Sequence, residues 1–431
     1  MTRGLLDMHQ MPGLPAEFRR PGRLALLAGL AGLAGCLLVW FLLAIRGDHW
    51  AQAAAAFYKA YLFAWLFWLG MSLGAMAAVM VHHQTGGNWG VFVRRFGENA
   101  AAVLPLLFVL FIPILIGLGR IYPWADPHNH DPVIRHKHFY LNVPFFILRY
   151  VIYFVVWSGV AWALRALSVR HDRRPSVESR RLMRGISSFG LVAYFITMSL
   201  AAVDWIMSME PNWYSTVFGF IVLMGQAITG VCALIILLVL LRGTTPFVER
   251  LRPKHFNDLG NLLMTCVILW AYNDFAQLLI IWMGNTQVDI GWYVKRTQGA
   301  WKFIGALLIF LGFLTPFALL LLRDIKMRAR AMLWLCVGLL IMRLLDLYWM
   351  VMPGGTEPFP AIHWLGAIVG IIAVVGIGGL WIGAFLWLTG GVPLMVEGLS
   401  VPIETEPGDE LSPEHRVSEH GTEPGTQPGL A

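Results

Sequence analysis

The sequence predicts an all-α integral membrane protein with ten transmembrane helices, and two observations support this fold class. First, ten apolar stretches of about 20 residues or more follow one another along the 431-residue chain, and that length crosses the hydrocarbon core of a bilayer. Second, 58% of the residues are hydrophobic and only 13% are charged, which leaves too little polar surface for a soluble protein of this size. The stretches lack the alternation of barrel strands, so helices are the expected spanning elements.

The predicted spans share a high apolar content, and the loops between them carry most of the charged residues. The first span is too long for the apolar part of a secretory signal and no small-residue cleavage site follows it, so we expect it to remain as a helix. In chain order the spans are 23–45, 53–81, 100–119, 142–167, 186–207, 216–241, 257–283, 299–322, 330–352 and 362–389.

The spans divide the chain into six predicted parts. The last part is rich in Pro, Gly and Glu and cannot bury enough apolar surface to fold, so we expect a disordered cytoplasmic tail. The parts are a leader (1–22), a peripheral first helix (23–52), a first four-helix bundle (53–208), a second four-helix bundle (209–355), a peripheral tenth helix (356–390) and the tail (391–431).

An internal repeat predicts the two bundles. Residues of the first copy match residues of the second copy at one constant offset in residue number. Further along the chain the offset is smaller, because a loop of the second copy is shorter. Because four crossings return the chain to its starting side, spans 2–5 and 6–9 would form parallel copies. The first shift superposes Tyr58 on Tyr214, Gly74 on Gly230, Gly87 on Gly243 and Arg94 on Arg250, and the second superposes Asp204 on Asp346 and Pro211 on Pro353.

Basic residues gather on one side of the predicted topology. The largest group is the six arginines between Arg170 and Arg184, and the leader and the other loops on that side add more. Because Lys and Arg accumulate in cytoplasmic loops, both termini are predicted to be cytoplasmic in a multi-pass protein of the bacterial inner (plasma) membrane. The net charge of +7 is spread over short loops, so nucleic-acid binding is not expected. The opposite side has only Arg46, Arg120, Arg135, Lys137, Lys295 and Arg296.

A few charged or polar residues fall inside the spans, where each charge costs on the order of 3 kcal/mol and therefore suggests a function. Arg343 precedes Asp346 by three residues, so the two side chains share a helix face and form either a static ion pair or part of a proton path. The candidate proton relay consists of Asp204, Asn273, Asp274, Arg343 and Asp346. Near the span ends, we expect Lys59, Arg149, Arg165 and Lys302 to snorkel toward the interface.

Resident redox cofactors are not expected. No span has a histidine near its middle, where a membrane haem would need its ligands, and the four cysteines lie singly in separate spans without a Cys-x-x-Cys pair. The loop between the third and fourth spans is rich in imidazole and carboxylate groups, and its weak metal-site candidates are His128, His130 and Asp131. A solvated or partner-contacting loop is the alternative. Pro105 and Pro113 predict a kink in the third span.

Four long strings carry a family resemblance. They are FYKAYLFAWLFWLG (57–70), HHQTGGNWG (82–90), HKHFYLNVPFF (136–146) and AAVDWIMSMEPNWYST (201–216). The chain resembles the polysulfide-reductase membrane-subunit (NrfD/PsrC-like) family, and the match is closest to the F subunits (ActF) of alternative complex III. The resemblance extends over all ten spans.

The resemblance implies a two-bundle subunit of a respiratory quinol:cytochrome c oxidoreductase. It implies a sister NrfD-like C subunit, an iron–sulfur subunit and multihaem cytochrome c subunits as partners, with a terminal oxidase as a further candidate. Haem and iron–sulfur clusters would lie on the partners, and menaquinol or ubiquinol would be the substrate. The positions that match the quinol region are Lys59, Tyr140, Asn142 and Asp204. As a departure from that pattern, span 100–119 has no histidine or other strongly polar side chain.

Three functions remain open from the sequence. In the first, the chain supplies a docking surface and a proton route while its sister chain oxidises quinol. In the second, the chain itself binds and oxidises quinol, which photoaffinity labelling with a quinone analogue would reveal. The third is a secondary transporter, because duplicated bundles also occur in that class. It would be favoured if the purified chain carried no cytochrome.

Overall fold

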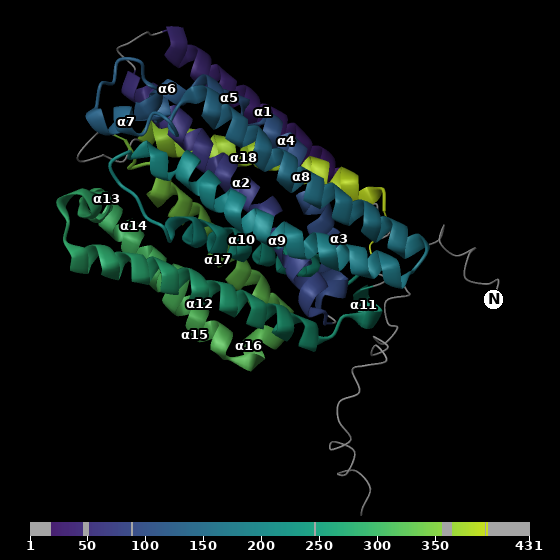
Figure 1. Cartoon of the computed structure of the whole chain (residues 1–431). Coiled ribbons are helices and arrows are strands. Elements are labelled where there is room, and N and C mark those ends of the chain that lie inside the picture. Colours follow the sequence, from purple (N-terminus) through teal and green to yellow (C-terminus); the bar gives the residue numbers. More distant parts are fainter. Residues whose placement is uncertain are drawn as a thin grey trace, which may run out of the picture. The chain divides into compact units, whose positions relative to one another are not determined.

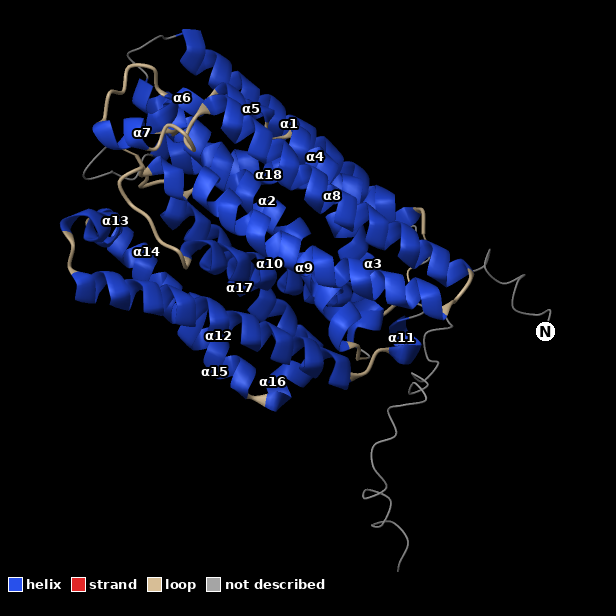
Figure 2. Ribbon diagram, in the orientation of Figure 1, coloured by secondary structure: helices blue, strands red, loops and turns tan. Residues whose placement is uncertain are grey.

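The computed structural model describes residues 19–45, 51–87, 89–244, 247–355, 364–392 and 394. The predicted leader lies outside the described residues except for residues 19–22, which belong to the first helix, and the predicted disordered tail lies outside them except for residues 391, 392 and 394. All regular structure within this part of the chain is helical, and no strand occurs in it (Figures 1 and 2). The predicted all-α class is therefore confirmed.

Ten helices in the described part of the chain are long and apolar enough to cross a membrane, as the sequence predicts. Seven of the spans are single helices, the fifth is a helix followed by a short 3-10 turn, and the third and eighth are divided into shorter segments. The spans are Arg20–Ile45, Ala53–Thr85, Trp89–Ile116, Val143–Arg173, Val177–Met209, Phe218–Leu241, Pro253–Gly284, Trp301–Leu321, Ala329–Val351 and Leu365–Gly390.

Helix α2 (Ala51–Thr85) lies at the centre of the helical body, and its apolar segment is completely buried by other helices. It packs against α10 (Phe218–Leu241), α18 (Trp364–Gly390) and α9 (Val177–Trp205). Glycines bring α2 and α10 into backbone contact, since a Cβ at Gly74 would lie 1.8 Å from the carbonyl oxygen of Gln226. Small residues permit such close crossings in membranes, where apolar burial alone gives helices no reason to associate.

Helix α1 (Arg19–Ile45) docks on α18, the last helix of the described chain (Figure 1). The two run antiparallel, with Gly29 and Gly32 of α1 against Gly376 and Gly379 of α18. A Cβ at Gly379 would lie 2.2 Å from the Ala25 carbonyl oxygen, so larger residues would separate the helices. Most of α1 is otherwise exposed, as expected for a peripheral helix that faces lipid.

The third span is broken where the sequence predicts a kink. It consists of α3 (Trp89–Ala101), α4 (Leu104–Val109) and α5 (Ile112–Ile116), and the short helix α6 (Leu118–Ile121) follows it; Pro105 and Pro113 stand in the first turns of α4 and α5. Proline removes a backbone donor and interrupts the helical hydrogen-bond pattern.

Aromatic side chains occupy the space beside this break and satisfy freed carbonyl groups. The Tyr61 hydroxyl donates to Leu110 O at 2.9 Å, and Trp65 Nε1 donates to Leu107 O at 2.9 Å. The Tyr150 hydroxyl donates to the carbonyl of Phe108. The kink therefore does not open a pocket at this place, because aromatic rings fill it and complete the backbone hydrogen bonding.

One boundary differs from the sequence expectation in a way that matters for the charged residues. The third membrane helix begins at Trp89 rather than near residue 100, so Arg94 and Arg95 lie within α3 and are buried instead of standing in a loop. The amphipathic pattern of α3, with charged residues spaced three and four apart, hides this segment from a search for apolar stretches.

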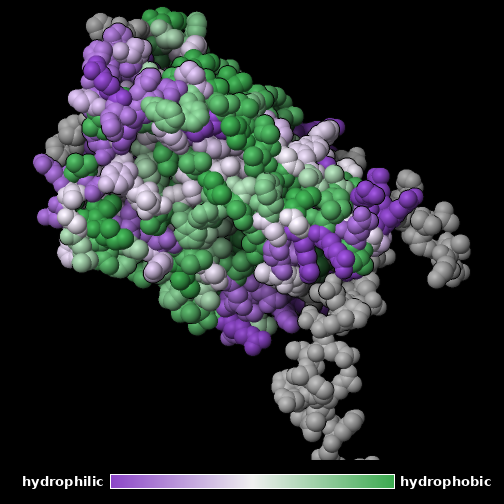
Figure 3. Space-filling model, in the orientation of Figure 1, coloured by the Kyte–Doolittle hydropathy of each residue, from purple (hydrophilic) through white to green (hydrophobic). Residues whose placement is uncertain are grey.

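The surface has a broad apolar region between two polar ends (Figure 3). We call the end that carries the α8–α9 connection the basic end; α8 spans Val143–Arg173. We call the end with α7 (Pro132–His136) and α13 (Gln287–Thr297) the opposite end. This distribution is that of a protein whose middle faces lipid and whose ends face water.

Candidate functional site

We name three groups of buried charges after one residue each. The Asp204 cluster consists of Asp204 with its side-chain partners Arg149 and Tyr153. The Asp346 cluster consists of Arg343, Asp346 and the neighbouring Asp274. The Arg94 cluster consists of Arg94, Arg95, Glu98 and Asp172.

In the Asp204 cluster the carboxylate is fully neutralised. Arg149 donates through Nε and Nη2 to the two oxygens of Asp204, each at 2.8 Å, and the Tyr153 hydroxyl donates at 2.7 Å. The guanidinium also donates to Tyr140 O at 3.0 Å and lies 3.9 Å from the centre of the Tyr140 ring. A bidentate Arg–carboxylate pair is the strongest such arrangement. Arg149 is 5% exposed, so it does not snorkel as its position near a span end suggested.

Aromatic rings pack tightly around this cluster. The Trp205 ring lies 5.0 Å from that of Trp65 and 5.6 Å from that of Phe111, nearly perpendicular to the first. Burial raises the pKa of the Tyr140 hydroxyl, and the nearby charge of Asp204 raises it further. The tyrosine therefore remains protonated, as a neutral group against a neutralised pair.

Only two of the four candidate quinol-contact residues share a hydrogen-bond partner in the described contacts. Tyr140 and Asp204 both meet Arg149. Asn142 instead caps α8, with its side-chain oxygen accepting from Phe145 N at 2.9 Å. Lys59 donates to the carbonyl of Gly354, in the segment after α17 (Ala329–Val351). Two of the four therefore have structural contacts elsewhere.

In the Asp346 cluster the charges are less evenly matched. Arg343 and Asp346 form the buried pair that their three-residue spacing predicts. The Arg343 guanidinium lies 4.7 Å from the Trp270 ring centre on α12 (Pro253–Gly284). One turn further along α12, Asp274 is within electrostatic reach of both members of the pair. Arg343 is thus paired with Asp346 and lies within electrostatic range of a second carboxylate, Asp274.

Asp274 differs from the other two aspartates in its own contacts. It is half-buried, and among the described residues no hydrogen bond or salt bridge joins its carboxylate. Toward the opposite end, Gln277 donates to the Tyr293 hydroxyl at 3.2 Å and accepts from the Ser215 hydroxyl at 2.7 Å. Burial raises the pKa of Tyr293, and the charge of Asp274 adds to this effect. Polar groups therefore continue from Asp274 toward the opposite end.

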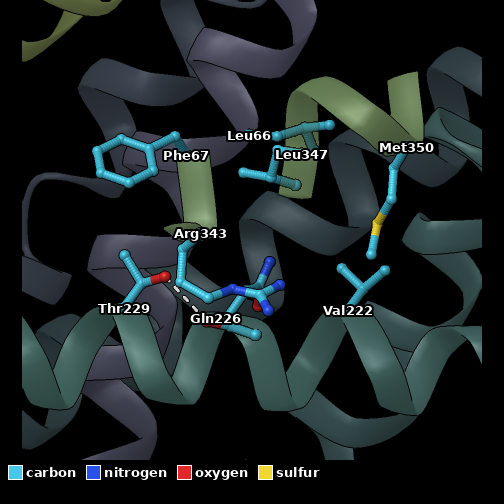
Figure 4. A pocket seen from close by; sticks show the side chains of 10 residues that line it. Leu66, Phe67, Val222, Gln226, Thr229, Arg343, Leu347 and Met350 are labelled. Atoms are coloured by element: carbon cyan, nitrogen blue, oxygen red, sulfur yellow. Dashed lines mark hydrogen bonds between the residues drawn. The ribbon is translucent and has the colours of Figure 1, made fainter. Parts of the chain in front are cut away.

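A small cavity is lined in part by Arg343 (Figure 4). Arg343 reaches from α17 toward Gln226 and Thr229 on α10, and Leu66 and Phe67 of α2 close the space. Its volume of about 10 Å³ fits one water molecule and no quinone ring.

The wall of this cavity joins the two halves of the chain. The Tyr194 hydroxyl of α9 donates to Gln226 Oε1 at 2.7 Å. A Cβ at Gly225 would lie 2.3 Å from Arg343 Nη2, so glycine is required there for the guanidinium to reach α10. Asn273, in contrast, donates to the Leu269 carbonyl of its own helix at 2.6 Å, and this hydrogen bond does not connect it to the cluster.

The Arg94 cluster was missed by the sequence analysis, which placed Arg94 and Arg95 outside the predicted spans. Arg94 binds Asp172 at 3.0 Å, Arg95 binds Glu98 at 2.8 Å, and Arg95 also pairs with Asp172. All four side chains are at least 92% buried. Next to it, Arg165 donates to Asn99 at 2.9 Å, so Arg165 does not snorkel either. The i, i+3 and i, i+4 spacing of the arginines to Glu98 was the available signal.

A second group of ion pairs that the sequence analysis missed lies at the opposite end. Arg296 is 1% exposed and donates to the carbonyls of Trp349 at 3.1 Å and Met350 at 2.7 Å. It also binds Glu210 at 3.0 Å, and Lys295 binds the same carboxylate at 3.3 Å. Burial lowers the pKa of Arg296, and the charge of Glu210 opposes this change. A cation at the C-terminal end of α17 is favourably placed against the helix dipole.

The weak metal candidates lie in an exposed loop. Asp131 accepts from Val133 N at 2.9 Å and caps α7. His128 is paired with Asp126 rather than with His130 or Asp131, and its backbone N–H lowers the pKa of Asp126. Within the described ranges, no three His, Cys, Asp or Glu side chains are grouped to hold a metal ion.

Comparison with known proteins does not add to these observations: no protein-family model matches the chain, and no curated protein is significantly similar to it.

Proposed function

We propose that this chain is the membrane-embedded subunit of a respiratory quinol:cytochrome c oxidoreductase and that the Asp346 cluster forms part of a proton route. One observation carries the proposal: Asp274 and Asp346 converge on Arg343, beside a cavity that fits one water molecule. A half-buried carboxylate in a membrane helix that lacks its own hydrogen-bond partner is a candidate for reversible protonation.

The order of the polar groups supports a half-route for protons. Ser215, Gln277 and Tyr293 extend from the opposite end toward Asp274, and the Arg343–Asp346 pair follows it, with the water-sized cavity beyond. Proton transfer needs groups that can bind a proton and water molecules between them. The path from that cavity to the basic end contains only Gln226, Tyr194 and Thr229 among the groups described above, so the half-route would end near the cavity.

The Asp204 cluster supports a different role. Its carboxylate is bound by three hydrogen bonds and surrounded by aromatic rings, which favours a rigid scaffold over a quinol pocket. We therefore place the quinol chemistry in the sister C subunit, and the iron–sulfur clusters and haems on the iron–sulfur and cytochrome c subunits. The four sequence strings that resemble NrfD-like proteins, and most closely ActF, support this assignment.

Contacts between α2 and α10 support the proposed duplication into two parallel four-helix bundles. Gly74 faces Gly230, and Gly70 faces Gln226, and each of these pairs is related by the same shift along the sequence. A residue meets its own counterpart where two equivalent copies pack about a twofold axis. In this proposal the axis passes between α2 and α10, the basic end is cytoplasmic, and the membrane is the bacterial inner membrane.

The first experiment is a purification of the full chain from its native membrane in mild detergent. We expect c-type haem absorbance and quinol:cytochrome c reductase activity to co-purify with the chain. A colourless single protein would contradict the proposal and favour a secondary transporter. Photolabelling with a quinone analogue then separates the two redox roles, because label on the sister chain alone supports the proton-route subunit, and label on this chain supports the quinol-oxidising alternative.

A further inference from the structure

Exposed arginines are concentrated in the connection between α8 and α9. Six arginines lie within 15 residues, and all are exposed: Arg170, Arg173, Arg174, Arg180, Arg181 and Arg184. Glu178 is the one exposed acid among them, since Asp172 is buried in the Arg94 cluster. We call residues 170–184 the basic hairpin. It lies at the basic end, where α8 and α9 leave the apolar region of the surface (Figure 3).

The position of the arginines on α9 is unfavourable without a bound anion. Arg180 and Arg184 stand in the first two turns of this 29-residue helix, at the positive end of its dipole, where basic side chains destabilise a helix and anions stabilise it. On α8 the situation is reversed, because Arg170 and Arg173 lie in the last turn and suit the dipole there. An anion between the two helix ends would be bound by both sets of arginines.

Exposed apolar stripes lead directly to these arginines. On α8, Val155 (65% exposed) and Trp162 (44%) follow one another on the face that ends at Arg170. On α9, Phe189 (68% exposed) and Val192 (60%) lie one to two turns after Arg184. A ligand that fits both features has an anionic head and long apolar chains. Free phosphate would fit only the first feature.

We propose that the basic hairpin binds the head group of an anionic phospholipid whose acyl chains lie along α8 and α9. Arginine suits this ligand because its planar guanidinium binds phosphate oxygens in pairs. Basic clusters just outside a membrane helix attract anionic lipids. The proposal concerns a surface that the proposed proton route does not use, so each can fail without the other.

The experiment is native mass spectrometry of the full-length chain in detergent, titrated with phosphatidylglycerol and, separately, with phosphatidylcholine. We expect preferential retention of phosphatidylglycerol and a roughly hundredfold weaker retention in the triple variant R173Q/R180Q/R184Q, given the attraction of each basic residue for an anionic surface. The matched control is R323Q/R328Q/R330Q, which removes three exposed arginines from the neighbouring basic loop. It should retain phosphatidylglycerol as the unchanged chain does.

Three outcomes would overturn the proposal: equal retention of the two lipids, unchanged retention by the hairpin variant, or an equal loss in the control variant. In the last case the lipid would respond to net charge and not to this site. A fourth variant, R173K/R180K/R184K, preserves the charge if the glutamine variant is unstable. We expect it to retain less phosphatidylglycerol than the unchanged chain, because lysine cannot bind phosphate in the bidentate manner of arginine. Full retention by the lysine variant would contradict the arginine-specific geometry.

Discussion

Asp204 and Asp346 occupy matching places in the proposed repeat, each seven residues before a proline, yet their surroundings differ. Asp204 receives a bidentate arginine from another helix and a tyrosine hydroxyl. Asp346 receives an arginine from its own helix, shares it with Asp274 and lies beside a small cavity. The same sequence pattern can thus hold a carboxylate rigidly in one half and leave charge incompletely matched in the other. Four variants test this difference.

The largest effect on stability is expected for Arg149→Met. The substitution leaves the Asp204 carboxylate buried among aromatic rings without its partner, which should lower the free energy of unfolding by about 3–5 kcal/mol. Thermal unfolding in detergent, followed by tryptophan fluorescence, would measure the loss. The double variant R149M/D204L removes both charges and should recover most of the stability. If R149M alone had no effect, the Asp204 cluster would not be the rigid member of the comparison.

Asp274→Asn should reduce proton movement strongly and stability little. An amide cannot carry a proton between donors and acceptors, and a relay group of this kind contributes about 10²-fold or more to a proton-transfer step. Proton release by the complex in proteoliposomes, measured with a pH-sensitive dye at fixed quinol turnover, would report the loss. The matched control is Asn273→Ala, one position away on the same helix and hydrogen-bonded only to its own helix in the described contacts. Equal proton release by the Asp274→Asn and Asn273→Ala variants would exclude Asp274 from the proton route.

Arg343→Met should destabilise the protein by about 2 kcal/mol, which is less than the effect of Arg149→Met. The smaller value follows because Asp346 and Asp274 would then be two adjacent carboxylates, and one of them can take up a proton. The same thermal-unfolding measurement applies. A loss equal to that of R149M would mean that the two aspartates have equivalent surroundings, which would remove the contrast between the halves.

The smallest effect is expected for Asn142→Ala. It removes the cap of α8 and should cost about 1 kcal/mol, whereas Asn142→Asp keeps a capping oxygen and should cost less. The KM for quinol in the assembled complex should remain unchanged in both. A raised KM with unchanged thermal stability would instead make Asn142 a quinol contact and would return the quinol site to the Asp204 end of this chain.

The sequence was sufficient for the fold class because apolar length is a strong signal in membranes. It also placed the break of the third span, since Pro105 and Pro113 act locally, and it paired Arg343 with Asp346, since their spacing lies within one helix. Each of these features depends on residues that are close along the chain.

Features that depend on distant residues were not predictable in this way. The partner of Asp204 is 55 residues away, and Arg149 near a span end gave no sign of its burial. The Arg94 cluster escaped because α3 begins with a charged amphipathic segment, which resembles a loop when only hydropathy is considered. Charges that neutralise one another across helices are invisible until the helices are placed together.

The docking of α1 on α18 has a consequence for how the protein is made. The glycine face of the first helix finds its partner only in the last described helix, roughly 350 residues later, which corresponds to about 18–70 s of ribosomal synthesis. During that interval Gly29 and Gly32 would face lipid or the insertion machinery. In a chain truncated before α18, the glycine face of α1 would therefore remain without its partner helix. Membrane quality-control proteases could recognise unfinished molecules by this uncovered face.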